Sequence, residues 1–283
     1  MPVLLGRRRA SRLRHGVAAL LACLGMALGL VVLAGPAPRA LAAPEVLMSS
    51  QSEQKLESLL AVRSASAGAA GSELSEILSR QFLGVPYGAN TLIGSASQPE
   101  RLVAELQRVD CFTFADYIEA LKRADSRDQF ITSLAGVRYK DGVVGFDTRK
   151  HFFTDWSAVS PAIATDITSS LAGAVQSTKS LNQKDTGGVY LAGLPVVSRT
   201  VSYIPSQQVD SSVLGQLRTG DYIGAYANDG GLDVTHVGIY VATPNGPVLR
   251  NASSLRANNA VVDSPLLDYL KTVPGVVVLR PVQ

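Results

Sequence analysis

The sequence predicts an α+β fold in which helices come first along the chain and a cluster of strands follows. Between residues 43 and 122, several stretches place apolar side chains every three or four positions, which is the spacing of one helix face. From residue 188 onward, short runs rich in β-branched residues are bounded by Gly, Asn, Asp and Pro. The sequence contains no internal repeat, so a repeat architecture is excluded.

Three helices are predicted in the first region. A surface helix lies within residues 43–71 and is followed by a linker rich in Ser, Ala and Gly. Ser72 is the expected N-cap of the second helix and Asp110 that of the third, because both side chains accept backbone N–H groups at helix starts. Cys111 therefore heads the buried stripe of the third helix. The three apolar faces comprise Leu56, Leu59 and Leu60; Leu74, Ile77, Leu78 and Phe82; and Cys111, Phe114, Ala115, Ile118 and Leu121.

The second region contains a further expected helix and then strands. Residues 136–206 are rich in loop-forming residues, apart from a helix predicted over Ala162–Leu181. Short apolar runs after this helix predict strands, because Gly, Asn, Asp and Pro bound each of them. These runs are Gly188–Ala192, Leu194–Ile204, Gly220–Tyr226, Val234–Val241, Val248–Asn251 and Val276–Leu279.

The composition excludes several classes of protein. A length of 283 residues allows one or two domains at about 150 residues each. The content of 25 Gly and 14 Pro is ordinary, so the chain is neither collagen-like nor broadly disordered. Two cysteines exclude a disulfide scaffold and any metal site that needs three or four thiolates.

The first 42 residues have the order of a secretory signal. Six arginines and no acidic residue fall within them, the apolar run Val17–Leu33 follows most of the arginines, and Ala40 and Ala42 are small residues at the cleavage positions. We expect cleavage after Ala42 and an exported, periplasmic or extracellular protein. The alternative is an uncleaved anchor, because the apolar run reaches the lower limit of about 17 residues for a span.

Removal of this signal changes the totals. Lys plus Arg falls from 26 to 20 against 23 Asp plus Glu, which makes the net charge −3 instead of +3. The mature chain has no basic run, so nucleic-acid binding is unsupported. Cys111 is then the single cysteine, and His151 and His236 are the two histidines. A lone cysteine in an oxidising compartment cannot form an internal disulfide, so Cys111 is either an inert buried residue or a reactive one.

Cys111, His236 and Asn251 are the candidate catalytic residues. The helix dipole favours a thiolate in the first turn, although a small buried apolar residue is the alternative role for Cys111. His236 begins a predicted strand whose alternation places it on one face with Gly238 and Tyr240. Asn251 lies in the next strand, where its amide oxygen can orient an imidazole base. The alternative role for His236 is that of a buried core residue, and the alternative for Asn251 is that of a turn residue at the end of a strand.

Several motifs resemble those of the NlpC-type, papain-like cell-wall cysteine hydrolases. The segment Asp110-Cys111-Phe-Thr-Phe is similar to their nucleophile motif, and His236-Val-Gly-Ile-Tyr to their base motif. Gly220-Asp221 resembles the turn before their first core strand, and the segment from Arg250 to Ser254 resembles the one that carries their third polar residue. Many members have histidine where this chain has Asn251, and asparagine is a known alternative there.

The N-acetylmuramoyl-L-alanine-amidase-like branch resembles the chain most closely, from about Leu74 to the C-terminus. The shared segments are Phe82–Tyr87, Arg138–Gly142, His151–Trp156 and Gly231–His236. The resemblance implies a papain-like fold in which the nucleophile cysteine begins a helix packed on a small antiparallel sheet or barrel that carries the histidine. It makes residues 72–283 the cysteine amidase domain, with residues 136–206 as an inserted substrate-recognition region.

The implied function is hydrolysis of the amide between N-acetylmuramic acid and L-alanine in peptidoglycan fragments. In this reaction Cys111 forms a thioester, His236 transfers protons and Asn251 orients His236. The alternatives are an endopeptidase for the D-glutamyl–diamino-acid bond of the stem peptide, a transferase with the same triad, and a non-catalytic wall-binding module. The implied partner is a muropeptide or peptidoglycan, and we expect a monomer without membrane contact after signal removal.

The resemblance also suggests residues that bind substrate. Tyr87 is expected to contact the substrate or to supply a second oxyanion donor. Arg138, Arg149 and Arg250 are candidate clamps for muropeptide carboxylates. Trp156 is expected to stack on a sugar or wall the cleft, with a small satellite core as the alternative. The remaining expected site residues are His151, Asp155 and Ser253.

Neither a metal nor a cofactor is expected. His151 and Asp155 lack the His-Glu-x-x-His spacing of a zinc site. No Gly-rich loop follows a strand and opens a helix, as phosphate binding in nucleotide cofactor sites requires.

Overall fold

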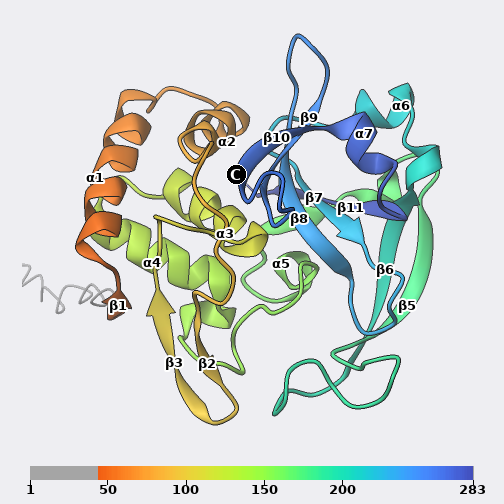
Figure 1. Cartoon of the computed structure of the whole chain (residues 1–283), viewed down its shortest axis with the longest axis horizontal. Helices are drawn as coiled ribbons and strands as arrows, with labels where there is room; N and C mark the ends of the chain where they lie inside the picture. Colours follow the sequence, from red (N-terminus) through yellow and green to blue (C-terminus); the bar gives the residue numbers. More distant parts are fainter. Residues whose placement is uncertain (1–43, 283) are drawn as a thin grey trace, which may run out of the picture. The chain divides into compact units, whose positions relative to one another are not determined.

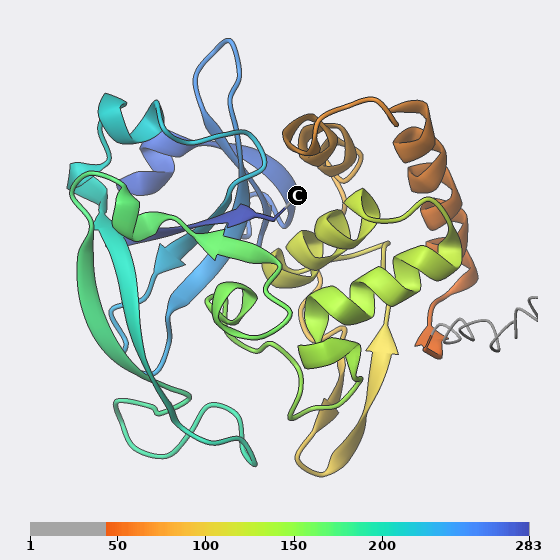
Figure 2. The same cartoon turned by 180° about the vertical axis from the view of Figure 1, so that it is seen from behind.

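A helical layer from the first half of the chain packs against a sheet from the second half (Figure 1). The computed structural model describes residues 44–282. The predicted export signal, residues 1–42, and its cleavage site lie outside the described residues. Seen from behind, the helices and the sheet again lie side by side (Figure 2).

The helical layer contains four helices of ten or more residues. α1 begins after Ser49, whose side chain accepts the N–H of Ser52, and it buries Leu56 and Leu59. α2 begins two residues earlier than expected: its N-cap is Ala70 instead of Ser72, and no side chain caps it, so the predicted capping role of Ser72 is wrong. The four helices are α1 (Ser50–Ala65), α2 (Gly71–Arg80), α3 (Cys111–Lys122) and α4 (Arg127–Arg138).

α3 is the central helix of this layer. Nine of its residues, from Thr113 to Leu121, are buried, because α2 and α4 flank it and strands of the sheet cover a further face. A small sheet accompanies the helices, with the strand order β1-β3-β2. Its strands are β1 (Val46–Leu47), β2 (Ile93–Ser95) and β3 (Gln98–Val103).

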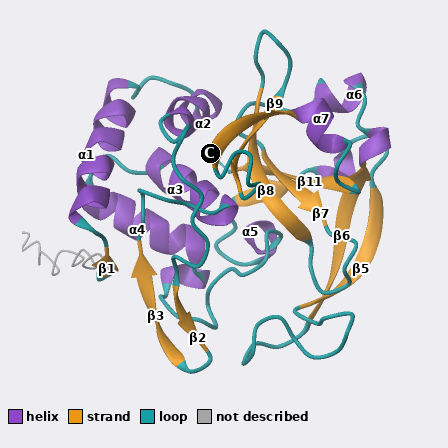
Figure 3. Ribbon diagram, viewed as in Figure 1, coloured by secondary structure: helices purple, strands orange, loops and turns teal. Residues whose placement is uncertain are grey.

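The main sheet has eight strands and pairs in the order β10-β9-β8-β7-β11-β6-β5, with β4 beside β11 (Figure 3). All of its strand pairings are antiparallel. The strands are β4 (Ala164–Asp166), β5 (Val175–Leu181), β6 (Val197–Pro205), β7 (Tyr222–Tyr226), β8 (Val234–Val241), β9 (Val248–Ser253), β10 (Ala260–Pro265) and β11 (Gly275–Pro281).

The predicted helix over Ala162–Leu181 is wrong. This stretch forms β4, a 3₁₀ turn at Thr168–Ser170 and β5, which pairs with β6 over its full length. The predicted strand Gly188–Ala192 is also absent, because these residues lie in the loop between β5 and β6. In both segments, tertiary pairing rather than local apolar spacing decides the structure.

Side chains of β8 alternate between two hydrophobic cores, one on each face of the strand, as the sequence pattern of Val234–Val241 predicts. Val237, Ile239 and Val241 join the core that contains the helices, whereas Tyr240 joins a second core with Leu249. The two faces of this strand therefore link the helical layer to the outer part of the sheet.

Short helices and turns complete the described chain. They are α5 (Asp155–Ala158), α6 (Ser211–Leu214), α7 (Leu266–Leu270) and 3₁₀ turns at Lys140–Gly142, Thr168–Ser170 and Ser206–Gln208. Within residues 44–282, no helix has the length and apolar character needed to cross a membrane.

Candidate active site

Cys111 is the first residue of α3, and the capping residue before it holds it in place. The Asp110 carboxylate accepts the N–H groups of Phe112 and Thr113 at 3.1 and 2.7 Å. The Thr113 hydroxyl in turn accepts the N–H of Asp110 at 3.0 Å, which completes a capping box. The backbone on both sides of Cys111 is therefore fixed.

β8 brings a backbone donor to the sulfur. Successive residues of an antiparallel strand direct their N–H groups to opposite sides. Tyr240 donates its N–H to the carbonyl of Asp221, on the β7 side. The N–H of Val237, three residues earlier, therefore points away from β7. The registered pairs between β8 and β9 run only from Ile239 to Val241. The N–H groups of Val237, Cys111 and Phe112 reach the sulfur, where each favours the thiolate.

Burial nevertheless outweighs these donors. Desolvation raises the pKa of the Cys111 thiol to about 12, and the nearby Asp110 carboxylate acts in the same direction. Burial therefore opposes the thiolate that the position of Cys111 at the helix start predicts, and that expectation stays a prediction. Cys111 is a free, half-buried cysteine, and a nearby base would help to convert its thiol into a nucleophile.

His236 and Asn251 are hydrogen-bonded in a fixed orientation. His236 Nε2 lies 2.9 Å from Asn251 Oδ1. The Asn251 amide nitrogen donates to the carbonyl of Leu249 at 2.9 Å and to the Ser264 hydroxyl at 3.1 Å. Because a carbonyl only accepts, the amide cannot be reversed, and Oδ1 must face the imidazole. Nε2 therefore carries the proton, and Nδ1 remains available as a base.

The environment keeps this imidazole neutral. Desolvation lowers the pKa of His236 below its ordinary value of 6.5, although the Asn251 hydrogen bond and the Asp110 charge favour the protonated form. A neutral thiol on α3 thus lies beside the segment of β8 that carries a neutral imidazole.

Two tyrosines lie near the thiol. Tyr87, in the loop before β2, is half-buried, and a Cys111 thiolate and the Asp110 carboxylate contribute with burial to raise the pKa of its phenol. Burial, and to a smaller extent a Cys111 thiolate, also raise the pKa of Tyr269 on α7, and its ring centroid lies 6.2 Å from that of His236. Sequence reasoning missed Tyr269, because a five-residue helix offers no periodic pattern.

Arg138 and Arg250 are not placed to clamp a substrate. Arg138 is buried and donates to Asp116 and to the carbonyl of Val103, both at 2.7 Å. Arg250 is also buried and is held by Asp263 at 2.7 Å. Both guanidinium groups join separate elements of the fold, so the predicted clamp roles are corrected to structural ones.

Four other expected substrate residues are engaged within the protein. Asp155 is buried and pairs with Arg199 at 2.8 Å, and His151 Nε2 bonds the Phe146 carbonyl at 2.7 Å. Ser253 is buried and accepts the N–H of Leu255 at 3.3 Å. Trp156 is fully buried, with its ring 4.8 Å from that of Tyr222, so the satellite-core alternative describes it better than a sugar platform does.

A cavity of about 490 Å³ adjoins the start of α3 and includes Asp110 in its lining. Arg149 also lines it, and this guanidinium is bound to Glu100, so its charge is compensated. Another wall comes from residues 190–192 of the loop between β5 and β6, where the Tyr190 hydroxyl donates to Asp229 at 2.7 Å. Part of the region 136–206 thus lies beside the candidate site.

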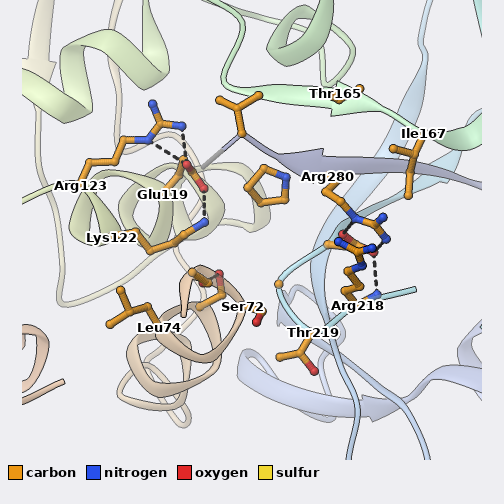
Figure 4. Close-up of a pocket in the computed structure, with 16 residues that line it drawn as sticks. Ser72, Leu74, Glu119, Lys122, Arg123, Thr165, Ile167, Arg218, Thr219 and Arg280 are labelled. Atoms are coloured by element: carbon orange, nitrogen blue, oxygen red, sulfur yellow. Dashed lines mark hydrogen bonds and ion pairs between the residues drawn. The ribbon is translucent and has the colours of Figure 1, made fainter. Parts of the chain in front are cut away.

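A larger cavity of about 940 Å³ lies at the other end of α3 (Figure 4). Its charges are largely compensated: Glu119 binds Lys122 at 2.9 Å and Arg123 at 2.6 Å, and Asp221 binds Arg280 at 2.7 Å. At 1.5 Å of rise per residue, Lys122 lies roughly 17 Å along the helix from Cys111. This cavity contains none of the predicted site residues. Among the described residues, no group of three His, Cys, Asp or Glu side chains could hold a metal ion.

The chain matches one protein family and several solved structures. The model of the family described as N-acetylmuramoyl-L-alanine amidase-like matches residues 77–276. A crystallised N-acetylmuramoyl-L-alanine amidase from Bacteroides uniformis is 28% identical, with a TM-score of 0.64 over 75% of this chain and 99% of that one. A Legionella pneumophila protein at 21% identity shares the fold, with a TM-score of 0.68 over 82% of this chain and 95% of that one. No match is found among curated proteins.

Proposed function

The chain belongs to the N-acetylmuramoyl-L-alanine amidase-like family, and from this premise we propose that it hydrolyses the amide between N-acetylmuramic acid and L-alanine in peptidoglycan fragments. One observation carries the catalytic part of the proposal. The His236–Asn251 hydrogen bond selects the imidazole tautomer in which Nδ1 is the basic nitrogen. His236 directly precedes Val237, whose backbone N–H reaches the Cys111 sulfur. A basic Nδ1 on a histidine adjacent to the residue beside the sulfur supports a cysteine nucleophile with His236 as its general base.

The proposed reaction begins with proton transfer. His236 Nδ1 takes the thiol proton as the Cys111 sulfur bonds to the amide carbon, and the carbonyl oxygen becomes an oxyanion. The C–N bond then breaks, and the imidazolium gives its proton to the departing amine of L-alanine. Water attacks the resulting thioester after losing a proton to His236, and the thiol leaves with that proton. The products are the lactyl carboxylate of the sugar and the free peptide.

The helix start supplies a donor for the oxyanion. The Asp110 carboxylate accepts the N–H groups of Phe112 and Thr113, and the N–H of Cys111, which lies beside the sulfur, is proposed as the donor to the developing charge. The Tyr87 hydroxyl is proposed as the second donor, because this residue lies close enough to the sulfur for a thiolate to raise its pKa. The cavity next to Asp110 is the proposed entrance for substrate.

Product analysis on one defined substrate tests the proposal. The purified protein is incubated with N-acetylmuramoyl-L-alanyl-D-isoglutamine extended by a diamino acid, and the products are identified by mass spectrometry. Free N-acetylmuramic acid and the intact peptide are expected. Cleavage after the D-glutamyl residue would instead support the endopeptidase. Equal product formation by the Cys111→Ser variant would contradict a cysteine mechanism.

Export is proposed on the sequence alone. The arginine-rich start, the apolar run Val17–Leu33 and the small residues Ala40 and Ala42 support it. A peptidoglycan substrate is consistent with this location. Amino-terminal sequencing of the protein purified from its native cells would show cleavage after Ala42 if the proposal holds, and an intact first residue if it does not.

A further inference from the structure

α7 carries an aromatic side chain to the candidate catalytic histidine. This helix, Leu266–Leu270, connects β10 to β11, and its first and last residues are buried in the second core. Tyr269 lies between these two anchors in sequence and is half-buried. Its ring centroid is 6.2 Å from that of His236, and the two ring planes are tilted by 43°. The tyrosine is thus mounted rigidly beside the imidazole.

The imidazole needs such a neighbour. One hydrogen bond, from Nε2 to Asn251, fixes one atom of the ring but does not prevent the ring from swinging about that atom. Gly238, the next residue on the same face of β8, contributes no side chain, and the Leu249 side chain occupies the space beside it. A displacement of about 1 Å in a catalytic group can cost about 100-fold in rate. A rigid aromatic wall would therefore have a catalytic effect without touching the substrate.

We propose that Tyr269 is a positioning residue whose ring holds the imidazole of His236 in the rotamer that bonds Asn251 and directs Nδ1 toward Cys111. The inference rests on the proposed function, and it assigns to α7 a role that the catalytic motifs do not contain. The ring, rather than the hydroxyl, carries this role. Tyr269→Phe should therefore preserve what Tyr269→Ala removes.

The ring also excludes water from the imidazole. Four groups face or lie near His236: Asn251 from β9, Asp110 and Cys111 from α3, and Tyr269 from α7. Only Asp110 among these is charged at neutral pH, and it favours protonation, so the lowered pKa of His236 is due to desolvation. Loss of the Tyr269 ring admits water and should move this pKa upward, toward that of an exposed histidine.

Nuclear magnetic resonance of the histidine ring nitrogens tests the proposal without requiring turnover. The titrations are recorded in the Cys111→Ala background, with His151 as an internal reference that lies outside the site. In this background His236 should titrate below 6.5 with its proton on Nε2. Adding Tyr269→Phe should leave the titration unchanged. Adding Tyr269→Ala should raise the midpoint of His236 and leave that of His151 in place.

A kinetic comparison accompanies the titrations. With Cys111 present, Tyr269→Ala should lower kcat by about 10- to 100-fold with little change in KM, since positioning affects the transition state. Leu267→Ala is the matched control, because Leu267 lies on the same short helix and is 51% exposed. It should retain full activity.

Two results would overturn the inference: an unchanged His236 titration in the Tyr269→Ala variant, or equal losses of kcat in Tyr269→Ala and Leu267→Ala. If the protein does not cleave muropeptides at all, the proposed function fails, yet the titrations still decide whether Tyr269 controls His236. The two failures are therefore distinguishable.

Discussion

His236 donates its Nε2–H to Asn251 over 2.9 Å, and the asparagine is itself locked by the Leu249 carbonyl and the Ser264 hydroxyl. The orientation of the proposed base is thus determined by hydrogen bonds to residues of β9 and β10. The predictions below test separate parts of this arrangement.

Asn251→Ala should lower kcat by about 10- to 100-fold and leave measurable turnover, because the imidazole loses its orientation but keeps its base. Steady-state kinetics on the defined muropeptide measure the loss. Asn245→Ala, a change in the exposed turn between β8 and β9, is the control and should be neutral. Full activity of Asn251→Ala would remove this residue from the site.

Alkylation of Cys111 should be slow at neutral pH and should accelerate steadily as the pH rises, because burial raises the pKa of the thiol to about 12. Iodoacetamide labelling followed by peptide mass spectrometry gives the rate at each pH. The same protein unfolded in urea is the reference and should react like a free cysteine. Labelling faster than that of free cysteine below pH 7 would restore the helix-dipole thiolate.

The acidic limb of the kcat/KM profile should lie below pH 6.5. His236 must be neutral to accept the thiol proton, and desolvation lowers its pKa, so activity falls only when the pH drops through that lowered value. A limb above pH 6.5 would mean that a different group titrates or that the imidazole is solvated.

Tyr87→Phe should lower kcat by about 100- to 1,000-fold if its hydroxyl donates to the oxyanion, since removal of one such donor has this effect. The phenyl ring keeps the packing of Tyr87 against the main core, so folding should be unaffected. A change confined to KM would assign the hydroxyl to substrate binding instead. An unchanged kcat/KM would exclude both roles.

Arg138→Ala should destabilise the protein by about 3–5 kcal/mol, because it leaves the buried Asp116 carboxylate without its partner. Urea unfolding measures the change. Arg101→Ala breaks an exposed pair with Glu45 and should cost at most about 1 kcal/mol. A raised KM at unchanged stability would return Arg138 to the role of substrate clamp.

Local patterns were sufficient for those elements whose side chains alternate or recur regularly. The expected strand Val234–Val241 coincides with β8, and the helix expected after Asp110 coincides with α3, because a buried face imposes its period on the sequence. The stretch 162–181 misleads because its apolar residues have a spacing that suits a helix, while its many Ser and Thr residues are equally compatible with strands. Its strands form through pairing with β6 and β11, which no local pattern contains.

The same limit applies to individual residues. An arginine in the sequence shows a charge but not its partner, and the partners Asp116 and Asp263 lie 22 and 13 positions away from Arg138 and Arg250. Tyr269 reaches His236 from a separate element for the same reason. Motifs located the candidate nucleophile, base and orienting residue, whereas burial and long-range pairing decide which of the surrounding residues are available.

Burial of the thiol also has a consequence for chemical durability. Oxidants attack the thiolate, and susceptibility follows thiolate character and access. Because Cys111 is held as a desolvated thiol, peroxide and disulfides should consume it slowly while no substrate is present. If the protein is exported as proposed, this slow oxidation would keep the proposed nucleophile intact in an oxidising compartment.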